Sequence, residues 1–320
     1  MSLAEASQPG TGARADLKHY QVFGLSLRSE IALPELHGAA PGEADVTIVL
    51  GKVPQRSEKQ GLTLFGEDAL LTIADVGRFW IRSGREIVVE PDPGTSERNV
   101  RLFLLGSALG GILHQRRLLP LHANAVEVEG RAIAFMGHPG AGKSTMAAWF
   151  LDKGHRVLAD DVCVVTFDAD GRPIAHPGIP RLRLWREAIE ATGRVAEDYE
   201  LSFDDMDKFN VPTLHAGPAE PLPLHHLYLL GKSGEDGSTP SIHALKGVAS
   251  VDALVANTYR GAYLALMDAT AQHLRQCLRL VSAVPVFTAN RRWGFDSFEG
   301  QANAIEAHAR ALIRGETGPS

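Results

Sequence analysis

This chain of 320 residues has few cysteines and no excess of positive charge. The two cysteines, Cys163 and Cys277, belong to no CxxC pair and to no Cys/His ligand spacing. The sequence therefore predicts neither a disulfide framework nor a zinc site, and this usage fits a reducing compartment. Asp and Glu (38) outnumber Lys and Arg (32), which gives a formal net charge of -6. That balance argues against a nucleic-acid partner or an anionic membrane surface, so any phosphate site must be local.

Long apolar runs are missing as well. The first twenty residues are small and polar, without the apolar core of a signal peptide, so we expect a cytoplasmic protein. The most apolar stretch, residues 102–113, contains three glycines. It is shorter than the ~20 residues that span a bilayer. We expect a buried helix there and no membrane partner.

Composition divides the chain into segments. Residues 1–16 are rich in Ala, Gly, Ser and Pro and are predicted to be disordered, as is the tail 315–320. Residues 17–94 hold short β-branched and aromatic runs, the first at 22–27, separated by Gly, Asp and Pro. These runs predict a small N-terminal β-rich domain with an antiparallel sheet. Thr95 or Ser96 is expected to cap a helix that runs to about Arg117 and opens a second domain, residues 95–314.

The second domain is predicted to alternate strands and helices. This order is typical of an α/β nucleotide-binding core. Strands are expected at 119–128, 132–136, 156–159 and 163–167, with two more near 224–230 and 284–290; helices are expected at 143–153, 251–263, 271–281 and 298–313.

One segment of this core carries a phosphate-binding pattern. Gly137-His138-Pro139-Gly140-Ala141-Gly142-Lys143-Ser144 matches GxxxxGK[ST], directly after the apolar strand 132–136 and at the start of a predicted helix. The motif requires this strand–loop–helix context. Glycines let backbone N–H groups turn toward phosphate oxygens, and the helix N-terminus adds partial positive charge. The sequence therefore predicts an ATP site in this P-loop, with Thr145 as a further member.

Two residues of the loop and a pair of aspartates have predicted chemical roles. Lys143 should reach the β- and γ-phosphates, and the hydroxyl of Ser144 should ligate Mg²⁺, unless it serves only as a helix cap. Asp160 and Asp161 follow the strand 156–159, and ligands of open α/β sheets bind at such strand ends. One carboxylate can hold Mg²⁺ while the other accepts the proton of an attacking hydroxyl. The alternative is a solvated turn after the strand.

Residues 121–144, LHANAVEVEGRAIAFMGHPGAGKS, and residues 152–161, DKGHRVLADD, resemble the catalytic domain of the HPr kinase/phosphorylase family. That bacterial family phosphorylates a serine of a phosphocarrier protein. The resemblance is strong over residues 119–167 and implies a P-loop kinase core that uses ATP and Mg²⁺. It further implies that Asp160 is the base, that Asp161 lies beside the metal, and that His122 supports the reacting phosphoryl group.

Two regions depart from that family. Where its bifunctional members carry Glu-x-Arg-Gly, this chain has residues 177–185, PGIPRLRLW, so the dephosphorylating activity is not supported. Residues 1–95 do not resemble the family's usual N-terminal domain. A smaller relative from lasso-peptide gene clusters phosphorylates a precursor peptide at a C-terminal serine, and the unusual N-terminal region favours such a substrate. The family tends to form hexamers, so a homo-oligomer is an expected partner.

Arg183 and Lys208 are further candidates for phosphate or substrate contacts, because a transferring phosphoryl group needs cationic clamps. The alternative for both is a surface charge on a loop. Besides a protein or peptide serine kinase, two functions stay open on the same core. One is a small-molecule kinase, and the other is a nucleotide-binding regulatory module without catalysis. The paired aspartates argue against the second, since a binding module has less need of a base.

Overall fold

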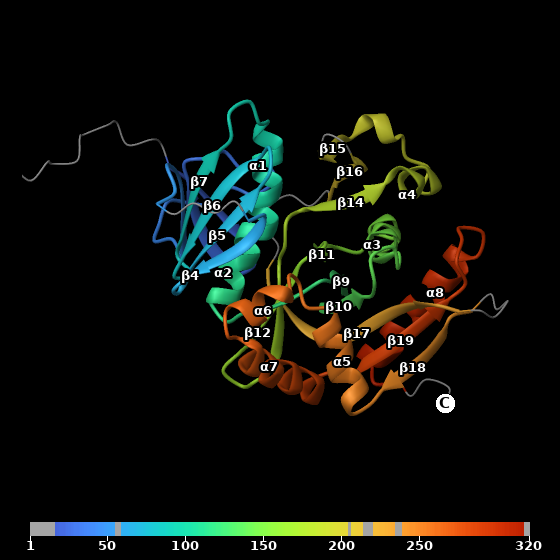
Figure 1. The fold of residues 1–320 in the computed structure, drawn as a ribbon. Helices are drawn as coiled ribbons and strands as arrows, with labels where there is room; N and C mark the ends of the chain where they lie inside the picture. Colours follow the sequence, from blue (N-terminus) through green and yellow to red (C-terminus); the bar gives the residue numbers. More distant parts are fainter. Residues whose placement is uncertain (1–16, 55–58, 204–205, 214–219, 234–238, 317–320) are drawn as a thin grey trace, which may run out of the picture.

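The computed structural model describes residues 17–54, 59–203, 206–213, 220–233 and 239–316. It is a mixed α/β structure with an N-terminal sheet, a larger core sheet and a small third sheet (Figure 1). The predicted disordered segment 1–16 and most of the predicted tail lie outside the described residues. Among the residues described, no helix is both long enough and apolar enough to cross a membrane.

The N-terminal sheet contains the predicted strands but differs from the prediction in two ways. It is mixed rather than antiparallel, because β2 and β7 both run parallel to β3. A tight turn cannot join parallel neighbours, and a long connection accordingly separates β2 from β3. The predicted strand at 22–27 is a hairpin that turns at Phe23 and Gly24, whose φ angles are 59° and 75°. The order is β1-β2-β3-β7-β6-β5-β4, with β1 (Lys18–Val22), β2 (Leu25–Ser29), β3 (Val46–Leu50), β4 (Gly61–Phe65), β5 (Asp68–Ile73), β6 (Gly77–Arg82) and β7 (Glu86–Pro91).

A long helix lies beside this sheet, as predicted. The hydroxyl of Ser96 caps it by accepting from the Asn99 N–H at 3.2 Å. The helix comprises α1 (Glu97–Phe103), a π-helical turn η1 (Leu104–Ala108) and α2 (Leu109–Gln115). Its buried side chains form one hydrophobic cluster with the N-terminal sheet and with Val162 and Tyr259 of the core. Because this cluster joins residues before and after position 94, it marks no boundary there, and the predicted domain boundary stays a prediction.

The core sheet brings four strand ends to one edge. Strand β17 is parallel to both β10 and β19, and β9 lies antiparallel between β10 and β11. Strands β11, β10, β17 and β19 therefore run in the same direction. The strands are β8 (Leu119–Leu121), β9 (Asn124–Val128), β10 (Arg131–Met136), β11 (Val157–Ala159), β12 (Cys163–Phe167), β13 (Pro173–His176), β17 (Leu222–Lys232), β18 (Ser241–Leu245) and β19 (Val286–Arg291).

Two predictions for the core need correction. The predicted strand 119–128 is two strands, β8 and β9, which pair with different neighbours on either side of His122 and Ala123. The predicted helix 251–263 is divided at Asn257, whose side chain and carbonyl bond to other parts of the core. The core helices are α3 (Lys143–Asp152), α5 (Val248–Ala256), α6 (Ala262–Leu266), α7 (Thr270–Ala283) and α8 (Phe298–Ile313).

A small sheet that the sequence analysis did not predict lies near α3 (Figure 1). Its order is β14-β16-β15, and both pairs are antiparallel. Contacts between α3 and β14 connect it to the core, so it forms a wall beside the P-loop. Its elements are β14 (Arg181–Trp185), α4 (Arg186–Ala191), a 3₁₀ turn η2 (Ala196–Asp198), β15 (Glu200–Phe203) and β16 (Met206–Pro212).

Candidate active site

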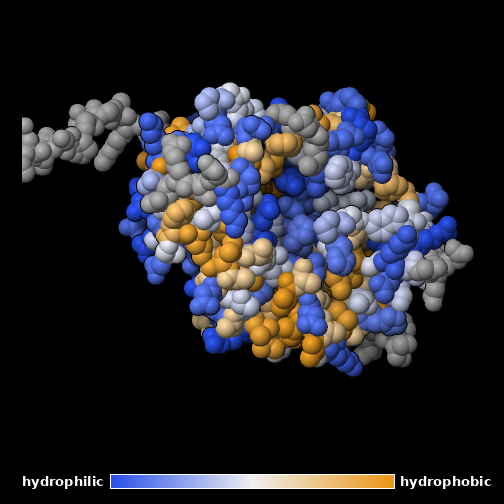
Figure 2. Space-filling model, viewed as in Figure 1, coloured by the Kyte–Doolittle hydropathy of each residue, from blue (hydrophilic) through white to orange (hydrophobic). Residues whose placement is uncertain are grey.

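A cavity of about 500 Å³ lies at the shared edge of the parallel strands. This volume is in the range of small-molecule sites, roughly 300–1,000 Å³. Figure 2 shows a recessed hydrophilic area between the N-terminal sheet and the small sheet. Many of the predicted site residues line the cavity; Gly137, His138, Ala141 and Asp160 do not. The predicted residues in its lining are His122, Pro139, Gly140, Gly142, Lys143, Ser144, Thr145, Asp161, Arg183 and Lys208.

The loop between β10 and α3 has the backbone conformation that its glycines allow. Gly137, Gly140 and Gly142 have φ angles of 145°, 83° and 81°, a region that side chains disfavour. A Cβ on Gly137 would lie 2.9 Å from the Leu230 carbonyl oxygen, and one on Gly142 would collide with the guanidinium of Arg291. The backbone contact requires glycine at position 137, and the positive φ favours glycine at position 142, directly before the start of α3.

Lys143 is a buried cation in this loop. Its Nζ donates to the carbonyl oxygens of Gly137, at 2.8 Å, and His138, at 3.4 Å. Burial lowers its pKa, and the charges of Asp161 and Asp160 oppose that effect. Bonds to neutral carbonyls leave its positive charge available to an anion at the start of α3.

Asp160 sits behind the loop with both carboxyl oxygens in hydrogen bonds. Its Oδ1 accepts from Asn124 Nδ2 at 2.5 Å and from Ser144 Oγ at 3.0 Å, and its Oδ2 accepts from the Arg183 backbone N–H at 2.7 Å. Burial raises the pKa of Asp160, and the negative charge of Asp161 raises it further. A cation bound beside Ser144 would offset both effects.

Asp161 faces the cavity from a strained turn with a φ of 69°. Its Oδ1 lies 3.3 Å from His122 Nδ1, and its Oδ2 lies 3.7 Å from Arg183 Nη2. Burial acts to raise the pKa of Asp161, but the nearby positive charges, Arg183 foremost, outweigh burial and hold it below its usual value. Burial lowers the pKa of His122, whose Nδ1 also lies 3.0 Å from the Asp161 carbonyl oxygen. Because both neighbours are acceptors, Nδ1 carries the hydrogen and orients the imidazole.

The cavity is rich in positive charge. Four basic side chains line it, Lys143, Arg183, Lys208 and Arg291, against two acids, Asp161 and Glu187. The Nε of Arg183 is buried without a hydrogen-bond partner among the described residues, and burial lowers the pKa of Lys208. Such an excess favours a highly charged anion in the cavity.

Several site residues were missed by the sequence analysis. Asn124 bonds to Asp160, and Asn257 Oδ1 accepts from the Gly137 N–H at 2.9 Å. Arg291 Nη2 donates to the Ala141 carbonyl oxygen at 2.8 Å. Arg291 ends β19, and the same strand-end rule that selected Asp160 could have found it. No comparable signal was available for Asn257, because its position depends on the break between α5 and α6.

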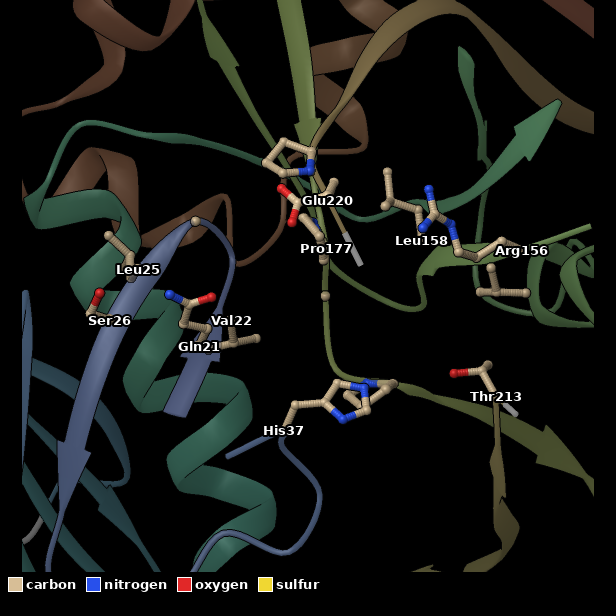
Figure 3. A pocket seen from close by; sticks show the side chains of 15 residues that line it. Gln21, Val22, Leu25, Ser26, His37, Arg156, Leu158, Pro177, Thr213 and Glu220 are labelled. Carbon is tan, nitrogen blue, oxygen red and sulfur yellow. The ribbon is translucent and has the colours of Figure 1, made fainter. Parts of the chain in front are cut away.

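A second cavity, of about 160 Å³, lies between the β1–β2 hairpin and residues 177–180 (Figure 3). Gln21, Val22 and Leu25 line it from the N-terminal sheet, and Arg156 and Leu158 line it from the core. The Phe23 N–H donates to the Pro177 carbonyl oxygen at 2.8 Å and connects the two parts there. None of the P-loop residues belongs to its lining. The groups suited to phosphate chemistry therefore lie in the larger cavity.

No protein-family model matches the chain, and no curated protein matches it in sequence. Among solved structures, the chain is similar to the Hpr(Ser) kinase/phosphatase from Coxiella burnetii, with a TM-score of 0.31 and 12% identity. The similarity covers 61% of this chain and 98% of that one. It is too distant to transfer an activity or a residue's role.

Proposed function

We propose that this chain is an ATP-dependent kinase that transfers the γ-phosphoryl group of Mg-ATP to a serine hydroxyl of a protein or peptide. One observation carries the proposal: Lys143, Ser144 and Asp161 line one cavity with an excess of positive charge, and Asp160 accepts a hydrogen bond from Ser144 directly behind it. Phosphoryl transfer needs a phosphate cradle, a metal ligand and a base, and this group of residues offers all three.

The donor set beside the P-loop suits Mg²⁺. The Ser144 hydroxyl and Asp160 Oδ1 are 3.0 Å apart, so one hard cation can reach both oxygens. When bound, Mg²⁺ would neutralise charge on the β- and γ-phosphates. We therefore give Asp160 the metal-side role that the resemblance implied for Asp161.

Asp161 is then the proposed base. It lines both the nucleotide cavity and a smaller pocket formed by Gly106, Arg181 and Tyr259, among others. A hydroxyl that enters from the smaller pocket would give its proton to the Asp161 carboxylate. Its oxygen then forms the new bond to the γ-phosphorus while the bond to the β–γ bridging oxygen breaks and ADP leaves. His122 orients the base, and Lys143, Arg183 and Lys208 stabilise charge on the transferring group.

The smaller pocket, from which the accepting hydroxyl is proposed to enter, favours a substrate with a small cross-section. Leu102, Leu105 and Gly106 of the long helix form one wall of the smaller pocket. With a volume of about 20 Å³, the smaller pocket holds little more than the hydroxyl group itself. An extended peptide, such as a lasso-peptide precursor, is therefore proposed to present its serine there in preference to a folded phosphocarrier of the HPr type. The same narrowness suits a small-molecule hydroxyl, which is the second candidate acceptor.

Intact-mass analysis tests the proposal. The protein is incubated with Mg-ATP and, in separate reactions, an HPr-type carrier, peptides ending in serine, and small polyols. We expect a phosphoryl adduct on a peptide and none with Lys143→Ala. Adducts on the carrier or on a polyol would keep the kinase but change the acceptor. Tight ATP binding without any transfer would instead indicate a regulatory module.

A further inference from the structure

Exposed aromatic side chains lie on the other side of the P-loop from the aspartates. Trp293 and Phe295 follow β19, are each 48% exposed, and line the nucleotide cavity together with Phe298. The sheet order β11-β9-β10-β17, with β19 next to β17, separates them from Asp161. Large exposed aromatic rings at the mouth of a polar cavity indicate a ligand with a flat face.

Arg291 connects these rings to the P-loop. Its side chain is buried, with 4% of the residue exposed, and its Nη2 donates to the Ala141 carbonyl oxygen at 2.8 Å. The guanidinium lies over the rings of Trp293 and Phe298, at 5.5 and 5.3 Å from their centres. Its Nε is buried and has no hydrogen-bond partner among the described residues. A cation held in this way fixes the aromatic segment relative to the phosphate cradle.

The direction of a bound nucleotide follows from the two ends of the cavity. The transferring phosphate must lie near Asp161 and Lys143, because the chemistry occurs there. The remaining phosphates pass the start of α3 at Ser144 and Thr145, both in the cavity lining. The base is then directed toward the end of β19, where Trp293 and Phe295 lie.

We propose that Trp293 and Phe295 form a stacking platform for the base of the bound nucleoside triphosphate, and that Arg291 positions this platform. The inference rests on the proposed function, since it assumes that triphosphate occupies the P-loop. Stacking on an aromatic face does not distinguish one base from another. The expected ligands are therefore nucleoside triphosphates in general and not ATP alone.

Calorimetric titration with Mg-ATP and with Mg-tripolyphosphate tests the platform, because tripolyphosphate has no base. We expect Trp293→Ala to weaken ATP binding about 10-fold or more, and Trp293→Phe to stay within about 3-fold of wild type. Tripolyphosphate should bind all three proteins within about 2-fold, since the phosphate cradle is unchanged. Leu278→Ala, which removes a similarly exposed apolar side chain from α7, is the matched control and should change neither affinity.

Three outcomes would overturn the platform while the kinase proposal stands. One is unchanged ATP affinity in Trp293→Ala. Another is an equal loss of ATP and tripolyphosphate affinity, which would mean that the substitution disturbs the P-loop. The third is a loss confined to Trp185→Ala, which would put the base against the small sheet instead. A wild-type protein that binds neither ligand would refute the proposed function itself.

Discussion

At the scale of single residues, Asp160 and Asp161 differ in what their carboxyl groups contact. Asp160 is joined to the P-loop hydroxyl, while Asp161 is held between His122 and Arg183 at the cavity. The sequence placed both at the end of a strand near the P-loop but did not reveal which one faces Ser144. The orientation of the two carboxylates depends on the positive φ of Asp161, which turns its side chain away from Ser144.

Substitution of each aspartate by asparagine separates their roles. We expect Asp161→Asn to keep Mg-ATP affinity within about 3-fold and to lose roughly 10²–10⁴-fold in the rate of transfer, the contribution typical of a general base. Asp160→Asn should weaken binding of Mg-ATP more than binding of ATP without metal. Binding is measured by calorimetry, and transfer is measured under single-turnover conditions. The opposite pattern would restore the assignment implied by the family resemblance.

His226 provides a pH-dependent contribution to stability that is independent of the site. Burial, with His225 and His308 as neighbours, lowers its pKa from 6.5 to about 3. The unfolded chain therefore binds a proton at His226 below pH about 6.5, whereas the folded protein does not. Stability that is present above this pH is lost as the pH falls toward 3, by about 1 kcal/mol at pH 5.5.

The measurement is urea unfolding of wild type and His226→Phe at pH 7.5 and pH 5.5. The free energy of unfolding of the variant should fall less between the two pH values, by about 1 kcal/mol. Equal losses in the two proteins would show that another group causes the pH dependence.

At the scale of elements, local patterns were sufficient where one segment decides its own structure. The helix 298–313 was predicted with the bounds of α8, and the motif 137–144 leads from the end of β10 into the first residues of α3 as expected. The prediction failed where a break depends on distant partners. Residues 119–128 read as one strand, yet the chain turns at His122, whose N–H donates to the Asn257 carbonyl oxygen at 2.6 Å. The small sheet was missed because its strands gain burial from other elements: β14 packs against α3 and α4, and β15 packs against α1.

The P-loop and β19 act together as elements of the site. Gly142 has a φ of 81°, and a Cβ there would collide with the guanidinium of Arg291. We expect Gly142→Ala to weaken ATP and tripolyphosphate binding alike, by 10-fold or more, while the far-ultraviolet circular dichroism stays unchanged. Gly130→Ala is a matched control, because that glycine also has positive φ but no neighbour within 4 Å of an added Cβ. Equal affinities in both variants would contradict the predicted role of the loop conformation.

At the scale of the whole molecule, the helix formed by α1, η1 and α2 connects the two larger sheets. Its buried side chains belong to the same cluster as Phe79 of the N-terminal sheet and Tyr259 of the core. The π-helical turn lies where Leu105 and Gly106 line the smaller pocket beside the aspartates. Composition suggested a separate β-rich domain, but no local pattern could reveal that the connecting helix would form a wall of the site.

This arrangement predicts cooperative unfolding. Leu109 is fully buried in the shared cluster, so Leu109→Ala should lower the free energy of unfolding by about 2–5 kcal/mol. The N-terminal sheet contains Trp80 and the core contains Trp149. Variants that keep only Trp80 or only Trp149 should show the same denaturant midpoint by fluorescence. This should hold both with Leu109 in place and with Leu109→Ala. Two separated midpoints would mean that the parts fold independently.

Transfer of the γ-phosphoryl group of ATP at the P-loop is the activity that we propose for this molecule. Its most direct test is intact-mass analysis of peptides ending in serine after incubation with Mg-ATP and the wild-type protein, Lys143→Ala or Asp161→Asn. We expect a phosphorylated peptide with wild type, none with Lys143→Ala because binding and transfer are both weakened, and at most traces with Asp161→Asn. Phosphorylation that persists at the wild-type rate in both variants would contradict transfer at this site.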